Sequence, residues 1–196
     1  MNKYKRRLNS NCLPVIAIDG PAGAGKSTVA RLVAERLNYI YIDTGALYRA
    51  LTYKALQKGI DLRDEKALSD LAANTNIRLL AENGAAQRVL CDDEDVTYLI
   101  RTPEVSRYVP FVARVPGVRA NLVRIQREMS LNGGVVLDGR DIGSYVMPDA
   151  EFKFFLTASN RERALRRQKE LAAKGFQTDL IELEKEMIER DLLDSQ

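Results

Sequence analysis

Short apolar runs alternate with helical patterns along most of the chain. The runs Val15–Asp19, Tyr39–Asp43, Val135–Gly139 and Phe152–Ala158 are rich in β-branched or aromatic residues and predict strands. From Ser27 to Asn38, apolar residues return every three or four positions, which predicts a helix. Alternating strands and helices indicate an α/β fold with a central parallel sheet and right-handed crossovers.

More helices are predicted by the rest of the chain. Helical periodicity covers Thr44–Gly59 and Asp61–Asn76. The helical stretch Thr102–Gly133 is expected to be interrupted near Pro110 and near Pro116, because proline ends or kinks a helix. From residue 160 onward the pattern is again helical and strongly charged.

The segment Ile77–Thr97 differs from this alternation. Asn83 and Gly84 stand between two β-rich runs, which predicts an antiparallel hairpin. A hairpin in a chain that otherwise alternates strands and helices indicates an insert.

A glycine-rich loop, GPAGAGKS, joins the first predicted strand to the first predicted helix. Its spacing is the full P-loop pattern, G-x-x-x-x-G-K-S. Glycines let backbone N–H groups face a phosphate, and the helix start adds donors and partial positive charge. The lysine supplies a full charge for the terminal phosphates, and the Ser27 hydroxyl can bind Mg²⁺. The predicted ATP-binding residues of this loop are Gly20, Pro21, Ala22, Gly23, Ala24, Gly25, Lys26, Ser27 and Thr28.

Three further features narrow the class of nucleotide-binding protein. A regulatory GTPase needs a base-reading NKxD element, which the sequence lacks, and transport or remodelling ATPases are usually larger. Asp138 ends the apolar run VVLD, where it can organise a Mg²⁺-bound water or an acceptor. The chain has no histidine, so a general base must be a carboxylate, or the reaction must need little proton transfer.

Several arginines stand near predicted strand ends or helix starts. Transfer of a phosphoryl group between two nucleotides gathers many negative oxygens, which the protein must neutralise in a space closed to water. Arginine suits this role because its planar fork pairs with phosphate and stays charged. The candidates are Arg49, Arg101, Arg119 and Arg140, with a second group, Arg161, Arg163, Arg166 and Arg167, in a basic helical run that could form a lid.

The charge balance argues against a nucleic-acid partner. The 196-residue chain has a net charge of +3, but its first eleven residues carry four basic residues and no acid. Without those four, 26 basic and 27 acidic residues remain, so a broad polyanion-binding face is not expected. Residues 1–12 are expected to form a disordered basic leader.

The compartment is predicted from cysteine usage and hydropathy. Two cysteines, Cys12 and Cys91, and no secretory signal segment favour a reducing cytoplasm. No apolar run approaches the roughly 20 residues that span a bilayer, so no membrane partner is expected. A monomer is the simplest expectation for the assembly.

Five motifs occur in a fixed order: IAIDGPAGAGKST, IDTGALYR, VLDGRDIG, PDAEFKFFLTAS and ERDLLDS. Together they resemble the bacterial cytidylate kinases, the (d)CMP kinases of the nucleoside monophosphate kinase group, from Val15 to Ser195. The combination of DGPAGAGKS, DTGALYR and DGRDIG is specific to that family rather than to P-loop proteins at large. The resemblance implies a P-loop, three-layer αβα fold with a central parallel sheet, an NMP-binding insert that contains the antiparallel hairpin, and a helical lid.

The resemblance also implies the reaction and the division of the chain. The γ-phosphoryl group of ATP, bound with Mg²⁺, would pass to CMP or dCMP and give ADP and CDP or dCDP. The implied parts are a P-loop core at 13–60 and 98–158, an NMP-binding insert at 61–97 and a helical lid region at 159–190.

Residue roles follow from the family's pattern. Arg119 and Asp141 would read cytosine, since an arginine can donate to the ring carbonyl and nitrogen while a carboxylate accepts from the exocyclic amine. The predicted CMP-binding residues are Thr44, Arg49, Arg101, Arg119, Arg140, Asp141 and Asp194, the last for the ribose hydroxyls. The lid would bring Arg166 and Arg167 to ATP. The predicted catalytic residues are Lys26, Asp138, Arg140 and Arg190.

The chain departs from the family's pattern in two places. Family members usually hold cytosine with a small hydroxyl residue where this chain has Pro110, and Ser106 is the alternative. The family also continues beyond ERDxxDS with a further arginine, a strand and a helix, whereas this sequence stops at Gln196 and so looks truncated. If the chain ends there, weak activity and an exposed sheet edge are expected.

Three other interpretations stay open at the level of sequence. One is a P-loop kinase that acts on UMP, AMP or shikimate. Another is a nucleotide-binding module without turnover. The third is a nucleic-acid binder that uses ATP and a basic tail.

Overall fold

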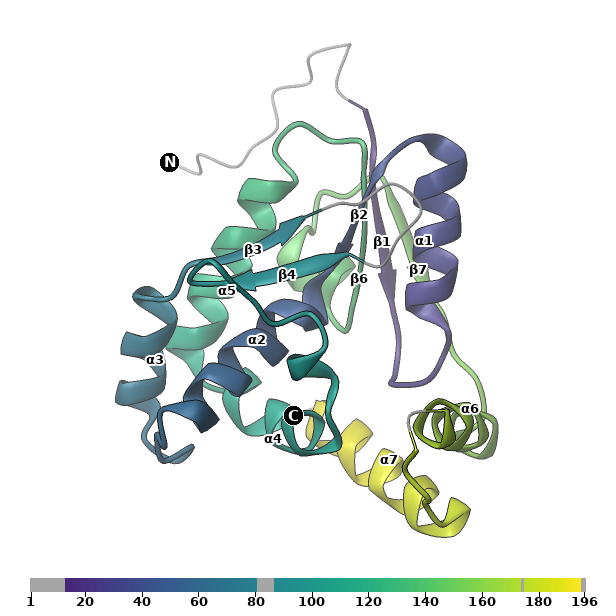
Figure 1. Cartoon of the computed structure of the whole chain (residues 1–196). Coiled ribbons are helices and arrows are strands. Elements are labelled where there is room, and N and C mark those ends of the chain that lie inside the picture. Colours follow the sequence, from purple (N-terminus) through teal and green to yellow (C-terminus); the bar gives the residue numbers. More distant parts are fainter. Residues whose placement is uncertain (1–12, 81–86, 174, 195–196) are drawn as a thin grey trace.

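Four parallel strands form the central sheet in the described part of the chain. The structure, a computed structural model, describes residues 13–80, 87–173 and 175–194 (Figure 1). The predicted basic leader at 1–12 and the hairpin turn at Asn83-Gly84 lie outside the described residues. The strands are β1 (Val15–Asp19), β2 (Ile40–Asp43), β6 (Val135–Gly139) and β7 (Phe152–Phe155), in the order β2-β6-β1-β7.

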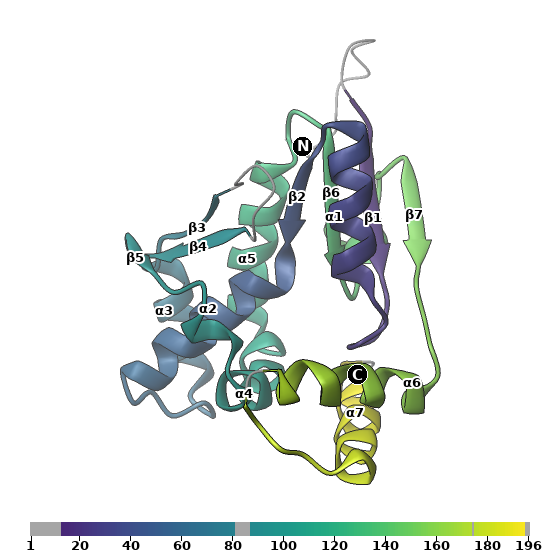
Figure 2. The same cartoon turned by 45° about the vertical axis from the view of Figure 1, so that its right-hand side comes forward.

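All three strand pairings of this sheet are parallel, which confirms the predicted central sheet. Strand β7 ends at Phe155, three residues before the predicted Ala158. In a parallel sheet the carboxyl ends of all strands meet at one edge, and ligands of open α/β folds bind there. The helices α6 (Asn160–Ala172) and α7 (Leu180–Asp194) lie at the end of the sheet to which the strand arrows point (Figures 1 and 2).

Helices cover both faces of the sheet and confirm the three-layer arrangement. On β1, Ile16 and Ile18 pack with Ala30 and Ala34 of α1 (Lys26–Leu37). The alternate residues Val15 and Ala17 pack with Val123 of α5 (Pro116–Met129) on the other face. A strand buried on both faces is a continuous apolar run, which is why VIAID predicted a central strand.

A second, antiparallel sheet stands beside the first and confirms the predicted hairpin. It consists of β3 (Ile77–Leu80), β4 (Arg88–Cys91) and β5 (Glu94–Asp95) in that order. Strands β3 and β4 share one hydrophobic cluster with four helices. Those helices are α2 (Thr44–Gln57), α3 (Glu65–Ala73), α4 (Pro103–Ala113) and α5.

Helix α3 is shorter than the predicted helix Asp61–Asn76. Asp64 is its N-cap, and the side chain accepts a hydrogen bond from the backbone N–H of Ala67 at 2.9 Å. Residues 61–64 form a turn instead, in which Asp64 N–H donates to the Asp61 carbonyl at 2.9 Å. The capping aspartate therefore sets the helix start four residues later than periodicity indicated.

The prediction of a helix interruption near Pro110 is wrong. Helix α4 runs through Pro110 to Ala113, and the break falls at residues 114–115, just before Pro116. Proline removes one backbone donor, but Val105, Val109 and Val112 of this helix are buried, so tertiary packing outweighs the local loss. Pro116 fits its expected position, since the first turn of a helix needs no such donor.

Over the described residues, two short helical segments complete the fold. They are η1 (Leu99–Arg101) before α4 and η2 (Ile142–Val146) after β6. Across the described ranges, no helix combines the length and the apolar character that crossing a membrane requires.

Cys91 provides a test of the packing of the second sheet. Its thiol is free and buried, and burial raises its pKa to about 11. Because the raised pKa favours the neutral thiol in the folded protein, about one molecule in a thousand carries the thiolate at pH 8. We expect iodoacetamide to label Cys91 at pH 8 at least tenfold more slowly in native protein than in urea.

The labelling is measured by mass spectrometry in a Cys12→Ser background, which leaves Cys91 as the single thiol of the chain. Equal rates in native and unfolded protein would contradict the packing of Cys91 against β3 and α2.

Candidate active site

The P-loop connects β1 to α1 and depends on glycine at two positions in particular. Gly20 has a φ of 143°, and a Cβ at this residue would overlap the carbonyl oxygen of Leu156. Gly25 is the N-cap of α1 with a φ of 97°, in the left-handed region that favours glycine. The loop therefore turns directly into a helix N-terminus, where backbone N–H groups and the helix dipole favour an anion.

Asp138 of β6 forms hydrogen bonds with residues of three other elements. Its Oδ2 accepts a hydrogen bond from Ser27 Oγ at 2.7 Å, and its Oδ1 accepts from Tyr41 Oη at 2.8 Å. Its backbone carbonyl accepts from Thr44 Oγ1 at 2.7 Å. The P-loop helix, β2, α2 and β6 are thus fixed to one another through a single residue.

Burial changes the protonation equilibrium of Asp138. Burial, assisted by the negative charge of Asp43, raises the pKa of Asp138, although hydrogen bonds from Ser27 and Tyr41 act in the opposite direction. Burial raises the pKa of Tyr41 as well, so the phenol stays a donor. A carboxylate kept in such a place favours a nearby cation.

The oxygens of Ser27 and Asp138 fit Mg²⁺ chemically. A hydroxyl and a carboxylate are hard oxygen ligands, and Mg²⁺ usually binds through one or two protein oxygens together with substrate phosphates. Among the residues that the structure describes, no group of three or more His, Cys, Asp or Glu could hold a metal by itself.

Two predicted arginines converge on Asp43 at the end of β2. Arg49 Nη2 lies 2.7 Å from Asp43 Oδ2, and Arg101 Nη2 lies 3.7 Å from the same oxygen. The other carboxylate oxygen accepts from the backbone N–H of Ala46 and caps α2. Two guanidinium groups around one carboxylate leave a net positive charge, as a phosphate site needs.

A second pair stands at the end of β6. Arg119 of α5 forms an ion pair with Asp141, and each side chain is about a third exposed, at 32% and 33%. The Arg119 guanidinium also lies 5.2 Å from the ring centre of Tyr145. The structure thus brings together, at a partly open surface, the two residues predicted to read cytosine.

The remaining predicted arginines reach the site to different degrees. Arg140 Nη1 donates to the Gly20 carbonyl at 2.7 Å, and Arg166 Nη1 donates to the Ala24 carbonyl at 3.1 Å. Arg167 instead pairs with Glu170 on its own helix. The backbone of α7 carries Arg190 and Asp194, whose side chains lie outside what the structure describes.

Three residues at the site were missed by the sequence analysis as functional positions. Asp19 accepts from the backbone N–H groups of Ile142 and Gly143 at 2.7 and 2.8 Å, and so holds the segment after β6. The others are Tyr41, whose hydroxyl donates to Asp138, and Asp43, which faces two arginines. Asp19 and Asp43 each end a predicted strand, and Asp138 stands one residue before the end of another, so this shared position is a signal that could have identified them.

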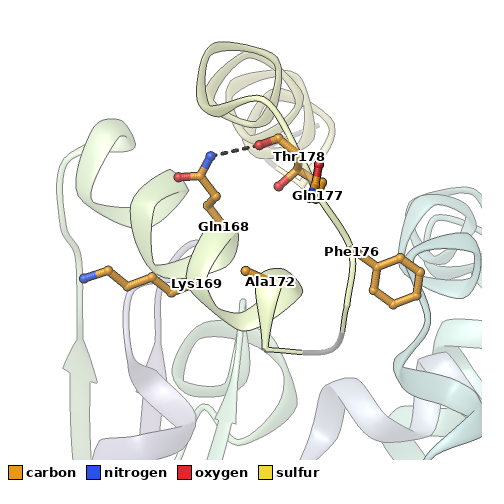
Figure 3. A pocket seen from close by; sticks show the side chains of 6 residues that line it. All are labelled: Gln168, Lys169, Ala172, Phe176, Gln177 and Thr178. Carbon is orange, nitrogen blue, oxygen red and sulfur yellow. Dashed lines mark hydrogen bonds between the residues drawn. The ribbon is translucent and has the colours of Figure 1, made fainter.

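A shallow cavity of about 380 Å³ lies between α6 and the segment that leads to α7. Figure 3 shows the Gln168 side chain of α6 donating to the Thr178 carbonyl across it, at 2.8 Å. The lining residues are Gln168, Lys169, Ala172, Phe176, Gln177 and Thr178. None of them is a predicted site residue, so the candidate site is defined by the strand ends and not by this cavity.

A parallel α/β sheet with a P-loop and converging arginines defines a P-loop phosphotransferase. A family model described as "Cytidylate kinase" matches residues 16–196, and the chain belongs to the cytidylate kinase family. It is similar to the cytidylate kinase of Pelotomaculum thermopropionicum, with 56% identity over 94% of this chain and 82% of the relative. It is also similar to that of Desulforamulus reducens, with 59% identity over 92% and 80%.

A likeness among solved structures is the crystal structure of TT1252 from Thermus thermophilus. It covers 89% of this chain and 85% of that chain, with a TM-score of 0.41 and 20% identity. At this level the likeness adds nothing to the assignment.

Replacing Asp138 separates its chemical role from a structural one. We expect Asp138→Asn to lower kcat by about 100-fold or more, because the carboxylate charge beside Ser27 is lost. We expect the melting temperature to stay equal or rise, since a neutral amide of similar shape replaces a buried charge. Steady-state kinetics and thermal unfolding measure the two effects.

Asp149→Asn, a change at an exposed aspartate, is the matched control and should alter neither quantity. Activity of Asp138→Asn within threefold of the unmodified enzyme would contradict the role of the carboxylate.

Proposed function

We propose that the chain transfers the γ-phosphoryl group of ATP, bound with Mg²⁺, to CMP or dCMP in pyrimidine nucleotide metabolism. The observation that supports this most directly is the 2.7 Å hydrogen bond between Ser27 and Asp138, which fixes the P-loop to the strand end beside the arginines. We place the reaction in the cytoplasm and assign it to a monomer without nucleic-acid or membrane partners. The free thiol of Cys91 is consistent with a reducing compartment.

The P-loop would hold the triphosphate of ATP. Its N–H groups and the N-terminus of α1 supply donors, and Lys26 Nζ donates at present to the Pro21 carbonyl at 2.8 Å inside the same loop. A phosphate that enters the loop offers this ammonium a charged acceptor in place of a carbonyl. Mg²⁺ bound with ATP would neutralise developing charge, with Ser27 as its ligand and Asp138 behind it.

The acceptor phosphate would bind beside the end of β2. Arg49 and Arg101 already face one carboxylate oxygen of Asp43, so a phosphate with more negative charge can draw both guanidinium groups toward it. Thr44 and Arg140 directly follow β2 and β6 at the same edge of the sheet, where they donate to the carbonyl oxygens of Asp138 and Gly20. The acceptor oxygen is an anion before it reacts, so the transfer needs no strong base, in agreement with a chain that lacks histidine.

Arg119 and Asp141 would select cytosine. The ion pair keeps both side chains in place, and cytosine presents a carbonyl and a ring nitrogen to an arginine and an amine to a carboxylate. Uracil presents a carbonyl where cytosine has the amine, and this oxygen would face the Asp141 carboxylate. A site built for one hydrogen-bond pattern rejects a base that leaves its polar groups unpaired.

The parts of the chain would divide the work accordingly. We propose a P-loop core at 13–60 and 98–158, an NMP-binding insert at 61–97 and a lid region at 159–190 that brings Arg166, Arg167 and Arg190 to the transferring phosphates. The approach of these arginines supplies charge and excludes water, which limits loss of the phosphoryl group to hydrolysis.

A coupled assay of ADP release with MgATP and each of CMP, dCMP, UMP and AMP tests the reaction. We expect turnover with CMP or dCMP at least tenfold above that with UMP and AMP. In Arg119→Met, kcat/KM for CMP should fall about 100-fold and that for UMP much less, because cytosine loses its paired donor. Arg124→Met, an exposed change on the same helix, is the control.

Faster turnover with UMP or AMP would identify a different nucleotide kinase. Binding of ATP and CMP without product would identify a nucleotide-binding module instead.

A further inference from the structure

The backbone carbonyl oxygens of the P-loop accept hydrogen bonds from cationic side chains at five consecutive residues. These donors come from the loop's own lysine, from the segment after β6 and from α6. The pairs are Arg140 with Gly20 at 2.7 Å, Lys26 with Pro21 at 2.8 Å, Arg163 with Ala22 at 3.0 Å, and Arg166 with Gly23 and Ala24 at 3.4 and 3.1 Å.

Arg163 differs from the other arginines of this set because it is buried, with 2% of its side chain exposed. While Nη1 donates to the Ala22 carbonyl, Nη2 donates to Asn160 Oδ1 and to Asp191 Oδ2 of α7, both at 2.5 Å. Burying a guanidinium costs a large desolvation penalty, which an ion pair and well-placed hydrogen bonds can offset. Asp191 supplies that charge from a helix 28 residues further along the chain.

The loop also packs against the two helices around this arginine. Ala22 lies against a small hydrophobic cluster of α6 and α7 that includes Leu171, Leu183 and Met187. A Cβ added at Gly23 would lie 2.9 Å from Met187 Cε and 3.1 Å from Arg163 Cβ. One side of the loop is therefore seated on the α6–α7 pair, which Figures 1 and 2 place at the carboxyl end of the sheet.

The hydrogen bond to Ala22 has a consequence for the next residue. The peptide bond between Ala22 and Gly23 is trans, and a planar trans peptide directs its C=O and its N–H to opposite sides. When Arg163 holds the Ala22 carbonyl toward α6, the Gly23 N–H must face away from α6. A donor bonded to the carbonyl also polarises the peptide and strengthens the N–H as a donor.

We infer that Arg163 is a positioning residue for the ATP phosphates. Paired with Asp191, it fixes the Ala22–Gly23 peptide plane so that the loop presents its N–H groups to phosphate before ATP arrives. This inference rests on the proposed function in one respect, since it takes ATP to be the ligand of the loop. The inference adds that α7, through Asp191, helps to set the direction of the N–H groups in the P-loop.

Isothermal titration calorimetry of MgATP and, separately, of CMP tests this directly on Arg163→Met, Arg163→Lys and Asp191→Asn. We expect Arg163→Met to weaken ATP binding at least tenfold while the Kd for CMP changes less than threefold. Arg163→Lys should lie between Arg163→Met and the unmodified protein, because an ammonium can reach fewer of the three acceptors. Asp191→Asn should weaken ATP binding in the same direction but less.

Arg124→Met, which breaks an exposed ion pair with Glu128 on α5, is the matched control and should leave both Kd values unchanged. If Arg163→Met does not fold, as circular dichroism would show, Arg163→Lys and Asp191→Asn decide the outcome at a temperature where both are folded. ATP affinity within twofold of the unmodified protein in the folded variants, or equal losses for ATP and CMP, would overturn the inference.

The same titrations separate this inference from the proposed function. Selective loss of ATP binding in a protein that turns over no CMP would support the role of Arg163 and contradict the proposed reaction. CMP turnover by the unmodified enzyme with unaltered ATP binding in the variants would support the proposed reaction and contradict the role of Arg163.

Discussion

The site depends on the parallel pairing of three strands that each carry an aspartate at the carboxyl end. Asp43 of β2 lies directly opposite Asp138 of β6, and Asp19 of β1 lies opposite Gly139. The three carboxylates have different partners. Asp19 binds backbone N–H groups after β6, Asp43 caps α2 and faces two arginines, and Asp138 accepts from Ser27 and Tyr41. A change of register by one residue would separate all three.

This arrangement concentrates charge in a small volume, and the protein balances it locally. Asp138 is buried with a raised pKa, next to a loop whose carbonyl oxygens face Lys26 and three arginines. The cations on its carbonyl oxygens hold the loop in place before a ligand binds. Such preorganisation is the main way in which a phosphoryl-transfer enzyme can lower its barrier, because the protein contributes little covalent chemistry.

Much of this was predictable from the sequence because the signals are local. The run VIAID, the P-loop spacing and the terminal aspartate of VVLD each predict their structure within a few residues, and Ser27 and Asp138 indeed meet. The continuation of α4 through Pro110 was not predictable, because it depends on the burial of Val105, Val109 and Val112. Arg163 was named only as one member of a basic run, and its burial was not predictable, because that burial depends on contacts with α7 that no local pattern records.

The central claim is that the Ser27 hydroxyl, held by Asp138, receives the metal that accompanies ATP. Calorimetric titration of ATP with Mg²⁺ and with EDTA, on the unmodified protein and on Ser27→Ala, measures it most directly. The account predicts that Mg²⁺ tightens ATP binding at least tenfold in the unmodified protein and less than threefold in Ser27→Ala. An undiminished effect of Mg²⁺ in Ser27→Ala would contradict it.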